Sequence, residues 1–169
     1  MLHRHTLAPL AHLSLLVLPL MAGCPGPSDE PFPADYETSW TEARTRCTLS
    51  HDHELRYIRV FVNDLALEPY TTQDVRYPPG AALLKAEYDD PDCTSLIDYV
   101  LMERLGPGEA PENLEWRWER YDTERNIMTD RRFEPETCIN CHVCHCGAPP
   151  YGWQLTCPEG APEPDGGCI

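Results

Sequence analysis

The clearest pattern in the chain is an alternation of apolar and polar side chains over short segments. In residues 114–122, the apolar residues Leu114, Trp116 and Trp118 stand at every second position, and charged residues stand between them. Successive side chains of a strand point to opposite faces, so this pattern predicts a strand buried on one face. Residues 55–62, 81–88 and 96–105 are the other predicted strands.

Turn-forming residues separate these strands, and short helices are expected beside them. Residues 89–95 (DDPDCTS) and 106–113 (GPGEAPEN) read as turns, as does the Pro-Pro-Gly of 78–80. Residues 37–47 have helical spacing, and 65–80 read as a short helical or looped segment. The fold class we expect is α+β, mainly an antiparallel β-sheet with a few short helices and a cysteine-rich C-terminal segment.

The N-terminal residues have the character of an export signal. Arg4 precedes an apolar run over 13–21, which is shorter than the about 20 residues of a transmembrane helix. The sequence Met-Ala-Gly-Cys at 21–24 resembles a lipobox, so we expect a lipoprotein signal peptide at 1–23 and lipid on Cys24. An ordinary cleaved signal is the alternative. The predicted location is outside the cytoplasm, anchored by lipid to a membrane and facing the periplasm or cell exterior.

The rest of the chain reads as a tether and one domain. Residues 24–36 contain several prolines, which suits a flexible tether. Residues 37–169 are about 130 residues, enough to bury one core. Acidic residues outnumber basic ones by 28 to 13, giving a net charge of −15. Nucleic acid is therefore not an expected partner, because phosphate binding needs clustered Lys and Arg.

Nine cysteines limit the chemistry further. In an oxidising compartment we expect them to be paired, bound to metal or modified. Four of them lie with two histidines in the ten-residue stretch CINCHVCHCG at 138–147.

This stretch contains Cys138, Cys141 and His142 in the C-x-x-C-H pattern of c-type haem attachment. Two cysteines three residues apart reach two vinyl groups of the porphyrin, and the adjacent histidine ligates the iron. A zinc site within 138–146 and a disulfide knot are the alternatives. Haem c is the cofactor that we expect, so residues 138–142 are predicted to attach the haem, and residues 143–147 to form a local brace whose two cysteines pair elsewhere.

The remaining cysteines make an even number if Cys24 carries lipid and haem takes two more. They are the candidates for disulfides: Cys47, Cys93, Cys144, Cys146, Cys157 and Cys168. Zinc or four disulfides also leave an even count, so the arithmetic does not choose between these readings.

The methionines of the chain limit which residue could be the second axial ligand of the iron. No methionine follows His142, so an axial Met is either Met102 or Met128. The simpler reading is one protein ligand and an open position, which suits binding a small molecule more than simple electron transfer.

An ordered series of motifs carries a resemblance to a known family. YIRVFVND, YPPGAALLKAEY, LEWRWERYD, CINCH and YGWQLT follow one another between residues 52 and 156. This order resembles the cytochrome P-460 family, together with the related beta-type cytochromes c-prime. The resemblance implies a mainly antiparallel β fold, a C-terminal haem motif and a homodimer. It also implies oxidation of hydroxylamine or binding of nitric oxide.

Lys85 is the only lysine of the chain, against twelve arginines. The cross-linking members of this family bond such a lysine to the porphyrin, five residues after a turn glycine, as Gly80 and Lys85 are spaced here. The resemblance therefore implies a catalytic role for Lys85, and a primary amine is needed for that bond. The alternative is a lysine whose stem packs on the sheet.

The expected function is that of a haem-dependent oxidoreductase or gas-binding protein. It would bind or oxidise a small nitrogen species and pass electrons to an acceptor cytochrome. Trp116, Trp118 and Tyr121 form an aromatic face that walls the haem or belongs to the core. A disulfide-rich lipoprotein module without cofactor and a simple electron-transfer cytochrome are the rival functions.

Overall fold

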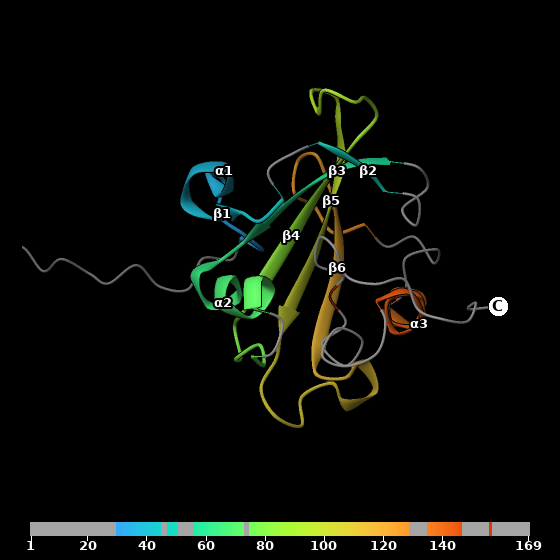
Figure 1. Cartoon of the computed structure of the whole chain (residues 1–169). Helices are drawn as coiled ribbons and strands as arrows, with labels where there is room; N and C mark the ends of the chain where they lie inside the picture. The colour runs from blue at the N-terminus through green and yellow to red at the C-terminus, as the bar shows by residue number, and fades with distance from the viewer. Residues whose placement is uncertain are drawn as a thin grey trace, which may run out of the picture. The chain divides into compact units, whose positions relative to one another are not determined.

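The strands form one antiparallel sheet of six in the computed structural model (Figure 1), with the order β1-β3-β4-β5-β6 and with β2 also paired to β3. The structure describes residues 30–44, 47–50, 56–72, 75–128, 135–146 and 156, without the side chains of 135, 144 and 145. The elements are α1 (Tyr36–Ser39), β1 (Thr41–Glu42), β2 (Thr48–Ser50), β3 (Arg56–Val62), α2 (Asp64–Thr72), β4 (Ala82–Tyr88), β5 (Leu96–Arg104), the 3₁₀ turn η1 (Pro111–Asn113), β6 (Trp116–Asp122) and α3 (Pro135–His145).

The predicted fold class and the four long strands are confirmed. Strands β3 to β6 lie within the predicted segments, and each pairs antiparallel with its neighbour in sequence. Gly80 has a φ of 82° in the predicted turn before β4, a conformation that glycine adopts without steric cost. Asn63 accepts a hydrogen bond from the Ala66 amide at 3.1 Å, which caps the start of α2. These local signals define the starts of β4 and α2.

The helix predicted over 37–47 is wrong beyond its first turn. Only α1 is helical, and the chain is already extended at Trp40. Residues Thr41 and Glu42 then pair with Val62 and Phe61 at the edge of the sheet. This pairing satisfies backbone groups with a distant strand, which the helical spacing of the segment does not reveal.

The domain begins earlier than residue 37. Phe32 and Tyr36, which the sequence interpretation assigned to the tether, are only 2% and 7% exposed. Their rings contact each other and Tyr99 on β5. The compact unit accordingly starts at Pro31. The predicted signal peptide and the lipidation site Cys24 lie outside the described residues.

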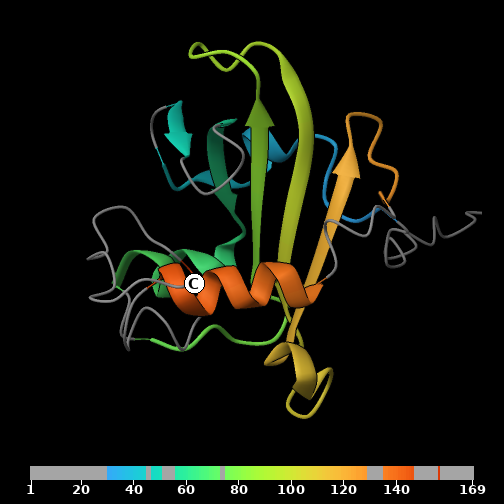
Figure 2. The ribbon, with the colours of Figure 1, turned by 90° about the vertical axis from the view of Figure 1, so that its right-hand side faces the viewer.

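The sheet is covered on both faces. Phe32, Tyr36, Phe61, Leu84 and Tyr121 belong to the cluster on one face. The opposite face, which we call the α3 face, carries the cluster of Val60, Leu83, Met102, Trp116, Trp118 and Ile139. Helix α3 lies across this face (Figure 2). Both faces being buried explains why β3 and β4 contain few exposed positions.

A disulfide joins Cys47, in the loop before β2, to Cys93, in the β4–β5 turn. Both were among the predicted disulfide cysteines, and the structure shows that they are partners. Cys146 is also disulfide-bonded. The predicted disulfide cysteines Cys157 and Cys168, like the side chain of Cys144, lie outside the described residues. In the described part of the chain no helix is long and apolar enough to span a membrane.

Candidate functional site

Helix α3 carries the C-x-x-C-H motif. Pro135 occupies its first position, where the missing amide hydrogen costs nothing, and Glu136 places a negative charge in the first turn. Cys138, Cys141 and His142 are spaced i, i+3 and i+4, so they lie on one face of the helix. All three are half-buried, and both cysteines are thiols. The motif therefore presents two thiols and an imidazole together.

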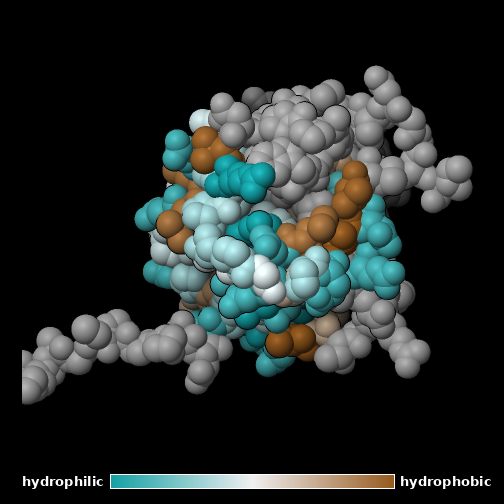
Figure 3. Space-filling model, turned by 90° about the horizontal axis from the view of Figure 1, so that it is seen from below, coloured by the Kyte–Doolittle hydropathy of each residue, from teal (hydrophilic) through white to brown (hydrophobic). Residues whose placement is uncertain are grey.

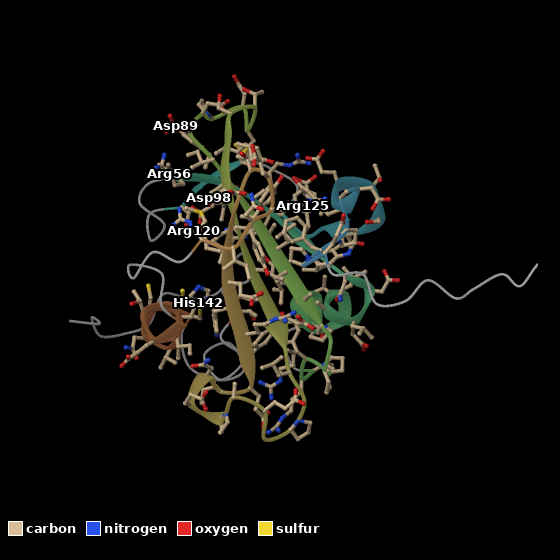
Figure 4. The ribbon with its side chains drawn as sticks, turned by 180° about the vertical axis from the view of Figure 1, so that it is seen from behind. Arg56, Asp89, Asp98, Arg120, Arg125 and His142 are labelled. Atoms are coloured by element: carbon tan, nitrogen blue, oxygen red, sulfur yellow. A yellow bond between two sulfur atoms is a disulfide. The ribbon has the colours of Figure 1, made fainter. Side chains whose placement is uncertain are left out.

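The motif faces the sheet. Ile139 is 8% exposed and belongs to the cluster of the α3 face. The imidazole of His142 lies against the ring of Trp118 on β6, with centroids 4.7 Å apart and planes at 74°. In Figure 4, His142 lies on the side of α3 toward the sheet. Trp118 thus supplies an aromatic wall next to the predicted iron ligand.

The structure also brings Lys85 to the α3 face. Lys85 pairs in register with Val100 on β5, and its side chain is 13% exposed. The Lys85 Nζ atom lies 3.3 Å from Glu87 Oε1. Burial raises the pKa of the Cys138 thiol, and the positive charge of Lys85 acts in the opposite direction. Lys85 and Cys138, far apart in sequence, are therefore electrostatic neighbours.

Three further charged side chains lie on this face, and sequence reasoning missed them. Glu87, Asp98 and Arg120 are 3%, 2% and 9% exposed. Arg120 forms an ion pair with Asp98 and lies 3.5 Å from a Glu87 oxygen. Figure 4 shows Asp98 and Arg120 side by side. With Lys85 they form what we call the charged row, running from β4 through β5 to β6.

A signal for the charged row was present in the strand pattern. Arg120 shares the parity of Trp116 and Trp118, and Glu87 shares the parity of Leu83. A charged residue at a core-facing position is expensive unless it is paired, which makes it a candidate functional residue.

Burial changes the proton affinities in the charged row. It lowers the pKa of the Lys85 amine, and the neighbouring Glu87 carboxylate acts in the opposite direction. Burial also raises the pKa of Glu87, while Lys85 acts to lower it. Both shifts favour the uncharged forms. A neutral Lys85 amine beside a neutral Glu87 carboxylic acid is therefore easier to form here than between the same two groups in water.

The three residues of the predicted aromatic face lie on two different faces of the sheet. Trp116 and Trp118 are both on the α3 face. Tyr121 is in the opposite cluster, in contact with Phe32. The inclusion of Tyr121 in that face is therefore wrong, because it has the opposite parity from the two tryptophans on β6.

The residues of the α3 face fit a c-type haem by their chemistry. Two thiols and one imidazole on a single helix are the donors that such a group requires. The Trp118 Nε1 and Asp98 Oδ1 atoms on this face are buried without a hydrogen-bond partner among the described residues. Such atoms are rare in folded proteins and point to a missing polar partner.

In the part that the structure describes, the other candidate ligands of the iron are Met102 and Met128. No group of three His, Cys, Asp or Glu side chains is arranged there to hold an ion. Met102 is buried on the α3 face, opposite Trp118 in the β5–β6 register. Met128 is 36% exposed.

Comparison with known proteins leaves this site without a named relative. No model of a known protein family matches the chain, and no characterised protein matches it by sequence.

Proposed function

We propose that this protein is an exported c-type haem protein that binds or oxidises a small nitrogen species, such as hydroxylamine or nitric oxide. The observation that carries the proposal is the position of Cys138, Cys141 and His142. They lie on one helix against a sheet face that holds the only lysine. The resemblance to the cytochrome P-460 family supports the choice of substrate.

The motif residues would hold the haem in defined ways. Each thiol would add across a vinyl group, so that a carbon–sulfur bond forms and the thiol hydrogen moves to the neighbouring carbon. His142 would ligate the iron, with its ring orientation restricted by Trp118. The haem, when bound, supplies an iron centre that exchanges electrons with a small ligand.

Lys85 is the proposed point of cross-linking. Its low exposure and lowered pKa favour the neutral amine, which is the nucleophilic form. Joining this amine to a porphyrin carbon removes one hydrogen from each. Two electrons then pass to an oxidant such as hydrogen peroxide. In its carboxylate form, Glu87 would accept the proton that the amine releases, because the two groups lie 3.3 Å apart.

The polar side chains of the α3 face would bind and orient a nitrogen substrate. A buried carboxylate and a guanidinium, in Asp98 and Arg120, lie on this face with Glu87. Such groups hold protons at fixed positions in a site that excludes water. We propose lipid anchoring at Cys24 and a soluble electron-acceptor cytochrome as the physiological setting.

The decisive experiment is to express the chain with a c-haem maturation system and to record its mass and visible spectrum. A mass increase of one haem, lost in Cys138→Ser and Cys141→Ser, is expected. If no haem mass is added, the proposal is wrong and the cofactor-free lipoprotein module becomes the better interpretation. A six-coordinate iron that does not respond to nitric oxide would favour the simple electron carrier.

The cross-link has its own test. Lys85→Arg keeps the positive charge but cannot form the bond, so haem should stay attached while the visible spectrum shifts. Arg117→Lys introduces a lysine on the opposite face of β6 and is the matched control. An unchanged spectrum in Lys85→Arg would remove Lys85 from the mechanism.

A further inference from the structure

A cavity lies at the end of the sheet where β5 and β6 are connected. It has a volume of about 350 Å³ and is lined by Arg76, Tyr77, Arg104, Pro111, Leu114, Glu115 and Trp116. We call it the β5–β6 pocket. This size is within the range of small-molecule sites, which combine apolar walls with a few polar groups. In Figure 3, which views this end of the domain, hydrophobic side chains lie among hydrophilic ones.

The loop that borders this pocket is strained. Ala110, Leu114 and Glu115 have φ values of 45°, 55° and 63°, although none of them is glycine. Such left-handed conformations are costly for residues other than glycine, and they cluster at functional sites. Leu114 is also 46% exposed, so its apolar side chain is open to solvent at the pocket.

The strained loop holds Arg104 in place. Arg104 donates a hydrogen bond to the Leu114 carbonyl at 2.6 Å and forms an ion pair with Glu115. Its guanidinium lies 5.6 Å from the centroid of the Trp116 ring. Glu115 in turn accepts a hydrogen bond from the Gly108 amide at 2.9 Å. The positive group is thus pre-organised at the pocket wall, which reduces the entropy lost on binding.

The lining of the pocket selects a chemical class of ligand. Among the described lining residues there are two arginines and one carboxylate, in a chain whose net charge is −15. A guanidinium matches the two oxygens of a carboxylate. The rings of Tyr77 and Trp116, 5.3 Å apart and at 67° to each other, form an aromatic corner beside it. These two rings are 5% and 1% exposed, so the accessible apolar wall of the pocket is Leu114, 46% exposed, against which a flat ring can pack.

We propose that the β5–β6 pocket binds a carboxylate attached to a flat unsaturated ring system. Two sources have this chemistry: the propionate groups of the haem and a separate aromatic acid. The first source rests on the proposed function.

The position of the pocket connects it to the motif helix. Helix α3 packs against both β6 and η1, and η1 begins with the lining residue Pro111. Trp116 precedes Trp118 by two strand residues, which is about 7 Å, and Trp118 contacts His142. A flat group held by α3 therefore has the pocket within its reach.

The test measures binding of 2-naphthoate by calorimetry to the mature chain, made with and without haem, with neutral 2-naphthamide as the control ligand. The haem-free chain should bind naphthoate at least about tenfold more tightly than naphthamide. Arg104→Gln and the exposed-site variant Arg76→Gln should each reduce that affinity about tenfold. Arg117→Gln, on the other face of β6, should not. If Arg104→Gln fails to fold, Arg76→Gln decides the result.

The haem-loaded chain separates the two sources. If haem propionates fill the pocket, naphthoate binding is lost on haem loading, and Arg76→Gln shifts the reduction midpoint potential while Arg117→Gln does not. If the natural ligand is a separate acid, both forms bind naphthoate. Absence of arginine-dependent binding together with an unchanged potential overturns the proposal. If no haem attaches, the proposed function fails, and binding to the haem-free chain still decides this one.

Discussion

The ring of Trp118 on β6 lies edge-on against the imidazole of His142 on α3, with 4.7 Å between the centroids. This contact joins the motif helix to the sheet. Trp118→Ala should lower the free energy of unfolding by about 3–5 kcal/mol, because a buried indole leaves a cavity. Trp118→Phe keeps a ring at His142 and should cost less than half as much. Equal losses in the two variants, measured by urea denaturation, would show that the ring contact contributes nothing.

Breaking the buried ion pair of Asp98 and Arg120 should lower the free energy of unfolding far more than breaking an exposed ion pair. Asp98→Asn leaves Arg120 with less compensation in a site that is nearly closed to water, so we expect a loss of about 3–5 kcal/mol. The matched control is Asp89→Asn, which breaks the pair with Arg56, where the side chains are 74% and 29% exposed. That variant should lose less than about 1 kcal/mol. Similar losses would contradict the burial of the charged row.

The Cys47–Cys93 disulfide should stabilise the edge of the sheet through the unfolded state. It closes a loop with a sequence separation of 46 residues, for which the loop-entropy relation gives about 4 kcal/mol. The double variant Cys47→Ser, Cys93→Ser should lose that amount in guanidinium denaturation. Reductant also breaks the disulfide of Cys146, so treating the wild-type chain with it should cost at least as much, and a loss below about 1 kcal/mol in the double variant would exclude a stabilising role.

In the haem-free chain, the Cys138 thiol should ionise at higher pH than an ordinary thiol. Burial raises its pKa and the charge of Lys85 partly offsets this, so Lys85→Met should raise the pKa further. Lys85→Arg stays positively charged at every pH of the titration and should not raise the pKa of Cys138. The measurement is the rate of iodoacetamide modification against pH in a Cys141→Ser background. A lower pKa in Lys85→Met would contradict the proximity of the two groups.

Much of this architecture follows from local sequence. The alternating segments predicted β3 to β6 to within about two residues at each end. The C-x-x-C-H spacing predicted that Cys138, Cys141 and His142 act together, but helix α3, which puts them on one face, was not predicted. The edge strand β1 was not predictable in this way, because its two residues become extended only by pairing with Val62 and Phe61. The same holds for Phe32 and Tyr36, whose tether-like surroundings gave no sign of burial.

The sequence by itself determined which residues carry chemistry: two thiols, one adjacent imidazole and a single lysine. Tertiary structure alone decided that Lys85 and the motif helix meet on the same sheet face, and that Glu87, Asp98 and Arg120 join them there. The physical reason is that strand parity is a local property with a period of two. The choice of the face on which α3 packs is made by contacts between segments distant in the chain.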